Sequence, residues 1–174
     1  MSAKRKHKEY PSAERIRALL SYDPDTGIFR WMPRSDRCPM PAGTLAGWSD
    51  RLGYLHISIG NEKYLGHRLA WKYVHGVDAV DQIDHINGNP ADNRICNLRI
   101  SDQSQNLANR RRKASAKYPK GVSVVRQNGK VSYIAQVCLR GDVHHVGTFP
   151  TAEEAGAAYF VKAREIHGEF ANAG

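Results

Sequence analysis

Residues 82–113 read QIDHINGNPADNRICNLRISDQSQNLANRRRK, and this stretch decides the fold of the region around it. Two short apolar runs, 82–86 and 97–100, bracket a loop rich in Asn, Gly, Pro and Asp, the residues that favour turns. Ser101 or Asp102 then offers an N-cap for a polar helix that is expected to continue to the end of the stretch. The pattern predicts a strand, a long loop, a second strand and a helix.

The polar residues of this stretch suit the hydrolysis of a phosphodiester. Asp84 and Asn106 offer a carboxylate and an amide oxygen, which are ligands that a hard divalent cation prefers. His85 has an ordinary pKa near neutrality and suits the role of base for the attacking water. Because successive strand residues point to opposite faces, Asp84 and His85 can share a site only where the strand ends or twists. A structural histidine beside a turn-rich loop is the alternative.

Residues 11–80 predict a mixed helical and strand region that supports this stretch. Ser12 offers an N-cap for a short helix, and a second helix is expected over 67–75. Strands are expected at 28–31, 54–59 and 63–65. Residues 32–47, which contain several prolines and glycines, are expected to be an irregular loop.

Residues 120–174 predict a second module of three strands and one helix. Asn128-Gly129 and Gly141-Asp142 mark the two hairpin turns, and Thr151 offers the N-cap of the helix. One helix covers only one face of a sheet, so the other face is expected to stay exposed. Residues 114–119 are interpreted as a linker. The predicted fold class is α+β, with residues 1–10 as a basic tail, 11–80 as a supporting region and 81–113 as the core of the first module.

The net charge of +9 is concentrated in one segment. The chain has 26 Lys and Arg against 17 Asp and Glu. Between Gln103 and Gly141 there are nine basic residues and no acidic one, so the rest of the chain carries equal numbers of both signs. A segregated basic stretch is typical of a protein that binds nucleic acid, whereas a merely solubilising surface mixes both signs.

Several other classes of protein are disfavoured by the composition. No apolar run is long enough for a membrane helix, and the basic N-terminus leads into no apolar signal segment, so we expect a cytosolic protein. Cys38, Cys96 and Cys138 are odd in number and have no paired spacing, which argues against a disulfide framework and against a zinc finger.

The positions of Asp84-His85, Asn97 and Asn106 resemble the motif of the HNH (ββα-metal) endonucleases, and in particular the phage homing members. The likeness rests on IDHINGN at 83–89, DNR at 92–94, NLR at 97–99 and NLANR at 106–110, and it extends upstream through 22–31 and 66–71. Downstream, the segments at 121–123, 147–149, 151–155 and 168–171 are similar to the Apetala-2/ethylene-response-factor DNA-binding domain.

The resemblance implies a role for each residue of the motif. Asp84 and Asn106 would be the metal ligands, with Asn109 as a nearby alternative to Asn106. His85 would be the general base, and Asn97 would orient the histidine loop through hydrogen bonds. Asn106 stands where many members have histidine, and an amide oxygen favours Mg²⁺, with Mn²⁺ as a substitute.

The resemblance also implies contacts to double-stranded DNA. Arg99, Arg110 and Arg111 are candidates for holding phosphates that flank the cut. In the second module the sheet would enter the major groove. Alternation along its second strand places Ser132, Ile134, Gln136, Cys138 and Arg140 on the exposed face. The candidate DNA contacts there are Arg126, Lys130, Gln136, Arg140 and His145.

The resulting hypothesis is a site-specific, divalent-metal-dependent DNA endonuclease of the free-standing homing type. It would leave 5′-phosphate and 3′-hydroxyl ends as a nick or a double-strand break. It is expected to act as a monomer, without a small-molecule cofactor, in the cytoplasm of a bacterial host. The alternative is a sequence-specific DNA-binding or regulatory protein with a vestigial nuclease unit. RNA binding is less favoured, because the exposed sheet face lacks an aromatic stacking platform.

Overall fold

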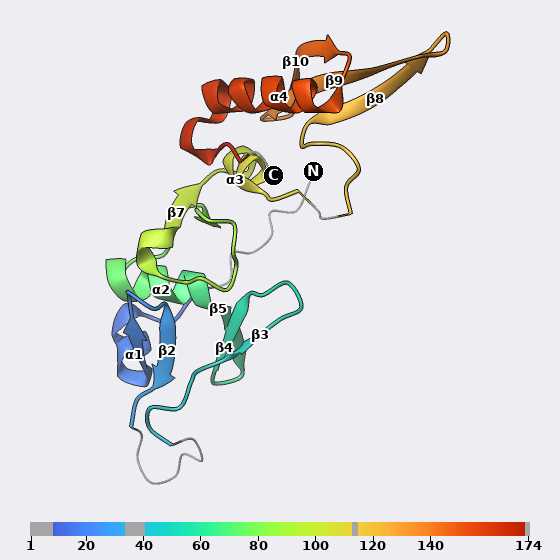
Figure 1. Cartoon of the computed structure of the whole chain (residues 1–174). Helices are drawn as coiled ribbons and strands as arrows, with labels where there is room; N and C mark the ends of the chain where they lie inside the picture. Colours follow the sequence, from blue (N-terminus) through green and yellow to red (C-terminus); the bar gives the residue numbers. More distant parts are fainter. Residues whose placement is uncertain (1–8, 34–40, 113–114, 173–174) are drawn as a thin grey trace. The chain divides into compact units, whose positions relative to one another are not determined.

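The structure, a computed structural model, describes residues 9–33, 41–112 and 115–172 (Figure 1). Its helices and strands form a mixed α+β arrangement, which confirms the predicted class at that level. The chain divides into two compact units, residues 1–100 and residues 101–174. In the part of the chain that the structure describes, no helix is both long enough and apolar enough to cross a membrane.

The N-terminal unit combines two helices with three small sheets. Its elements are α1 (Ala13–Leu19), β1 (Leu20–Asp23), β2 (Ile28–Trp31), β3 (Trp48–Ser49), β4 (Leu55–Ile59), β5 (Glu62–Leu65), α2 (Gly66–His75), β6 (Gln82–His85), the 3-10 turn η1 (Ile95–Asn97) and β7 (Leu98–Ser101). The strands pair as β1 with β2, β3 with β4 and β5, and β6 with β7. Its core is closed by fully buried apolar side chains: Ile16, Leu20, Phe29, Ile57 and Leu69.

Local sequence signals account for the boundaries of these elements. Oγ of Ser12 accepts a hydrogen bond from Arg15 N (3.2 Å), which confirms the predicted N-cap of α1. Gly76 ends α2 in the left-handed conformation (φ 77°), as helix C-caps often do. Strand β3 could not be predicted from the sequence, because two residues are too few to show an alternating pattern.

The C-terminal unit is a three-stranded antiparallel sheet with helices. It contains α3 (Gln103–Asn109), β8 (Val122–Gln127), β9 (Lys130–Leu139), β10 (Asp142–Phe149), α4 (Ala152–His167) and the 3-10 turn η2 (Gly168–Phe170). The strand order is β10-β9-β8, and α4 lies along one face of the sheet (Figure 1). Small residues allow a close approach: a Cβ on Gly121 would lie 2.1 Å from the ring of Tyr159. The strands and helix expected after residue 120 are therefore present.

Helix α3 begins where the sequence predicts and ends earlier. Asp102 and Gln105 form a capping box at its start. The helix ends at Asn109 because Arg110 takes an extended conformation (ψ 127°). Nζ of Lys120 donates hydrogen bonds to the carbonyls of Ala108 and Arg110, the latter at 2.8 Å. These contacts group α3 with the C-terminal unit, whereas the sequence placed it in a core at 81–113 followed by a linker.

Candidate active site around the histidine loop

The loop of residues 86–94, which we call the histidine loop, is held closed by Asn97. Oδ1 of Asn97 accepts a hydrogen bond from Asn87 N (3.0 Å). Its Nδ2 donates to Asn87 Oδ1 (3.1 Å) and to the carbonyl of Asp92 (2.8 Å). The backbone adds a bond from Ile86 N to the Asn97 carbonyl (2.9 Å). Asn97, which is buried, thus ties both ends of the loop to the start of β7.

The far end of the histidine loop rests on the β1–β2 hairpin. The hydroxyl of Tyr22 donates to the carbonyl of Asn93 (2.7 Å). Gly27 (φ 73°) lies against the same backbone, since a Cβ there would be 2.6 Å from Arg94 N. Tyr22 and Gly27, about seventy positions upstream, therefore hold the backbone of Asn93 in place. The side chain of Asn93 in turn contacts His85.

His85 ends β6 and is buried beside the loop, at 5% exposure. Its Nε2 lies 3.4 Å from Oδ1 of Asn93. An amide oxygen only accepts, so this contact favours the tautomer with the proton on Nε2. Burial lowers the pKa of His85, which keeps the imidazole neutral at pH 7. A neutral, oriented imidazole has the properties of a general base.

A second buried histidine lies against His85. The rings of His67 and His85 are 5.1 Å apart at a near-perpendicular angle, and Tyr54 contacts both rings. His67 is 6% exposed, and burial lowers its pKa to about 3. His85 and Arg68 act in the same direction, because a second positive charge close to theirs is unfavourable. His67 therefore has to be neutral in the folded protein.

The burial of His67 predicts a loss of stability in acid. Its pKa is lowered on folding, so the unfolded chain takes up a proton between about pH 6.5 and 3 that the folded chain does not. In the wild type, the free energy of unfolding should therefore decrease as the pH is lowered through this range. We expect His67→Phe to make this decrease smaller, by up to about 1.4 kcal/mol per pH unit. All three tryptophans lie in the N-terminal unit, so their fluorescence during urea unfolding reports on it. His75→Phe, at an exposed histidine, is the control. If the free energy of unfolding of His67→Phe depends on pH as steeply as that of His75→Phe, His67 is not the buried neutral group.

Asp84 contacts a different neighbour from His85. Its Oδ2 accepts hydrogen bonds from Nε (3.0 Å) and Nη2 (2.9 Å) of Arg99 on the paired strand β7. The two side chains are 5% and 12% exposed. In the structure the guanidinium of Arg99 is bound to the predicted metal ligand, and its predicted contact with a DNA phosphate stays a prediction.

The oxygen donors predicted for a metal are divided between the two units. Asp84 belongs to the N-terminal unit, and Asn106, on α3, belongs to the C-terminal unit. Among the described residues, no group of three or more His, Cys, Asp and Glu side chains is placed to hold a metal ion. A carboxylate with an amide oxygen nevertheless fits a hard divalent cation that keeps several waters. The pairing of Asp84 with Asn106, or with buried Asn109, stays a prediction.

The predicted DNA contacts of the sheet do not all share one face. His145 pairs directly with Gln136, and Lys130 has the same parity along β9, so these three residues lie on the exposed face. Arg126 pairs with Val131, which lies on the face that α4 covers. Register therefore places Arg126, which is itself exposed, on the opposite face from Lys130, Gln136 and His145, and its contact with DNA stays a prediction.

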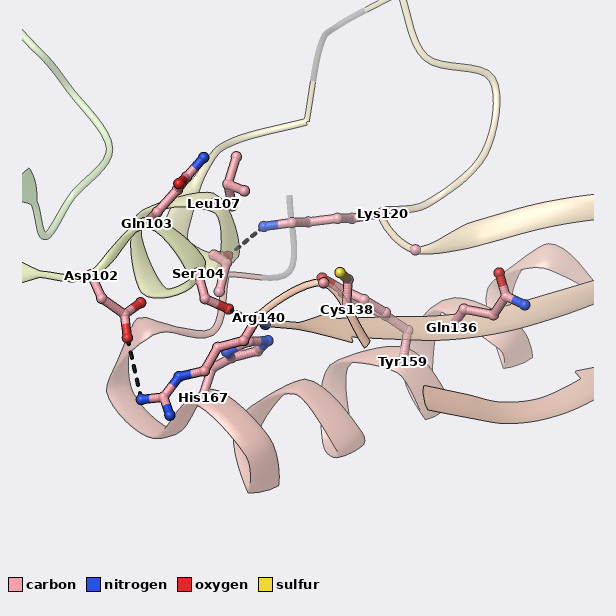
Figure 2. Close-up of a pocket in the computed structure, with 13 residues that line it drawn as sticks. Asp102, Gln103, Ser104, Leu107, Lys120, Gln136, Cys138, Arg140, Tyr159 and His167 are labelled. Carbon is pink, nitrogen blue, oxygen red and sulfur yellow. Dashed lines mark hydrogen bonds and ion pairs between the residues drawn. The ribbon is translucent and has the colours of Figure 1, made fainter. Parts of the chain in front are cut away.

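Arg140 lies beside α3, and its side chain is 76% exposed. It lies in the left-handed conformation (φ 52°) at the β9–β10 turn. Its backbone N donates to Ser104 Oγ (3.0 Å), and its guanidinium lies 3.6 Å from Asp102. Both contacts border a groove of about 760 Å³ inside the C-terminal unit, with Lys120 on its other side (Figure 2). Of the remaining candidates, Arg110 and Arg111 are exposed directly after α3.

Sequence reasoning missed Asn93 and Arg94, although both lie in the motif. Asn93 is 2% exposed and provides the acceptor that faces His85. Arg94 binds Asp92 through Nε (2.8 Å) and Nη2 (2.6 Å), which lowers the pKa of Asp92 to about 2 and keeps this loop carboxylate charged. The signal available was their position in the DNR segment at 92–94, which lies between His85 and Asn97 and belongs to the resemblance.

Two comparisons with known proteins match the part of the sequence that contains this site. A protein-family profile described as HNH endonuclease matches residues 64–108, from β5 through α3. An uncharacterised HNH endonuclease of Acanthamoeba polyphaga mimivirus is 36% identical over 89 residues. That alignment covers 51% of this chain and 44% of the relative, so the chain matches under half the length of the mimivirus protein. No solved structure matches the chain significantly. Residues 64–108 of this chain are therefore similar to the HNH endonuclease family.

Proposed function

We propose that the protein is a divalent-metal-dependent endonuclease that hydrolyses phosphodiester bonds of double-stranded DNA. The observation that carries this proposal is the state of His85: buried, neutral, and faced by Asn93 in a loop that Asn97 holds. A neutral, oriented histidine can act as a general base and accept a proton from water. The HNH endonuclease match at 64–108 supports a nuclease of this type.

Each side chain of the site has a defined part in this proposal. The imidazole of His85 removes the proton from the attacking water, while Asn93 faces its Nε2 and orients the ring. Asn97 keeps the histidine loop in place, and Asp84 with Asn106 would bind the cation. A bound Mg²⁺ or Mn²⁺ would stabilise the negative charge that develops on the phosphate and on the leaving oxygen. The products would carry 5′-phosphate and 3′-hydroxyl ends.

The C-terminal unit would position the enzyme on its target, as in the free-standing homing type. Its sheet has one face covered by α4 and one face that carries Lys130, Gln136 and His145. We propose that this unit is a DNA-binding domain of the Apetala-2 type, which the segments at 121–123, 147–149, 151–155 and 168–171 resemble. A monomer with a single metal site would most simply nick DNA in the host cell.

Mapping the products tests the chemistry. Incubation with phage and bacterial genomic DNA in Mg²⁺ should give discrete ends that DNA ligase rejoins, since a ligatable nick needs a 5′-phosphate and a 3′-hydroxyl. Ends that require kinase treatment before ligation would contradict the mechanism. Tight, specific DNA binding without any cleavage would favour the regulatory alternative.

The exposed sheet face predicts a separable effect on DNA affinity. We expect the triple variant Lys130→Ala, Gln136→Ala, His145→Ala to weaken binding to the target by about tenfold or more, because each lost contact contributes around 1 kcal/mol. Fluorescence anisotropy with labelled DNA measures this change. Arg126→Ala on the opposite face is the matched control and should weaken binding less. An Arg126 effect equal to that of the triple variant would refute the assignment of the face.

A further inference from the structure

The two strands that flank the histidine loop are joined by a buried ion pair. Asp84 on β6 accepts both hydrogen bonds from Arg99 on β7 at the same oxygen, Oδ2. The carboxylate is 5% exposed and the guanidinium 12%. The guanidinium thus binds one oxygen of the carboxylate that the proposed function assigns to a metal ion.

The chemistry of the pair makes it a competitor for a metal. A guanidinium keeps its charge throughout the pH range in which proteins work, so deprotonation does not release Asp84. An unpaired carboxylate in this buried position would be strongly unfavourable, so Asp84 has to be neutralised by one cation or another. A divalent ion that binds the same oxygen has to replace Arg99, and its apparent affinity falls accordingly.

We propose that Arg99 is a positioning residue that holds Asp84 charged and oriented in the metal-free protein and is displaced when a divalent cation binds. This inference rests on the proposed function, because it takes Asp84 as a ligand of the nuclease metal. The exchange of one cation for another keeps the buried carboxylate neutralised throughout. It also makes Arg99 the residue that sets how tightly the site binds its metal.

Mn²⁺ binding to the full chain tests the exchange without any measurement of cleavage. Free Mn²⁺ is followed by its electron paramagnetic resonance signal in titrations of the wild type, Arg99→Met, Arg99→Lys, Asp84→Asn and Arg30→Met. Arg30 is an exposed strand arginine of the same unit that bonds the Gly43 carbonyl, so Arg30→Met corrects for the loss of one positive charge. We expect Arg99→Met to bind Mn²⁺ about tenfold more tightly than Arg30→Met. Arg99→Lys keeps the positive charge and loses the paired hydrogen bonds, so its affinity for Mn²⁺ should lie between those of the wild type and Arg99→Met. If Arg99→Met does not fold, Arg99→Lys provides the result.

The outcomes separate this inference from the proposed function. If Asp84→Asn binds Mn²⁺ as the wild type does, Asp84 is not a ligand and both proposals fail. If Asp84→Asn loses binding while the Arg99 variants bind equally or more weakly than the wild type, only the inference fails, because Arg99 then supports the metal site. A second readout is the Nε–H resonance of Arg99, identified by its loss in Arg99→Met. It should shift on saturation with Mg²⁺, and an unchanged resonance would overturn the exchange.

Discussion

Replacing His85 by alanine is expected to reduce the rate of DNA cleavage by about 10²- to 10⁴-fold, the usual contribution of a general base. The reason is the environment of the side chain. Burial lowers the pKa of His85, which favours the neutral ring, and the Asn93 oxygen faces Nε2. Alanine removes the base and leaves the surrounding loop contacts of Asn97 in place.

Cleavage and binding should respond differently to this change. Single-turnover rates on a target duplex measure the chemical step, and fluorescence anisotropy of the same duplex measures affinity. His85→Ala should bind as the wild type does. His75→Ala, at an exposed histidine at the end of α2, is the matched control and should cleave normally. A His85→Ala variant that cleaves at the wild-type rate would eliminate His85 as the base.

Asn97→Ala should have the second largest effect, although Asn97 is a positioning residue. The change leaves the Asn87 amide, the Asn87 side-chain oxygen and the Asp92 carbonyl without their Asn97 partner. We expect the free energy of unfolding of the N-terminal unit to fall by about 1–3 kcal/mol, the typical cost of unsatisfied buried polar groups. Because the loop carries Asn93, the cleavage rate should fall by about tenfold to a hundredfold.

Hydrogen exchange distinguishes this role from a general loss of stability. The Asn87 amide, which donates to Asn97 Oδ1, should exchange faster in Asn97→Ala, while amides in the β3–β4–β5 sheet keep their protection. Asn97→Asp retains an acceptor for Asn87 and should recover part of the rate. Asn61→Ala, at the exposed β4–β5 turn, is the control. Unchanged exchange of Asn87 with full activity in Asn97→Ala would contradict the positioning role.

Much of the fold could be predicted because its signals are local. Ser12, Asp102 and Thr151 cap helices in the structure as the sequence indicated, and Gly76 ends α2. The hairpin turn at Asn128-Gly129 has positive φ at both residues, the conformation that this dipeptide favours. Each of these signals is decided by neighbours a few residues away, so no tertiary information was needed.

What the sequence did not reveal depends on contacts between distant segments. The Asp84–Arg99 pair joins two strands, and only their packing shows that Arg99 contacts this carboxylate. The contact of Asn93 with His85 depends on support from Tyr22 and Gly27, far upstream. The face of Arg126 depends on cross-strand register. Residue types predicted the chemistry of the site, while burial and pairing decided its geometry.

The central claim, that this chain cuts DNA with His85 as base and a divalent cation as cofactor, is tested most directly on supercoiled plasmid DNA. The wild type and His85→Ala are incubated at low ionic strength, where weak binding to non-target DNA is retained, with Mg²⁺, with Mn²⁺ or with EDTA. We predict nicked or linear product for the wild type with either metal, and none with EDTA or with His85→Ala. Product that persists in EDTA, or an equal yield from His85→Ala, would contradict the account.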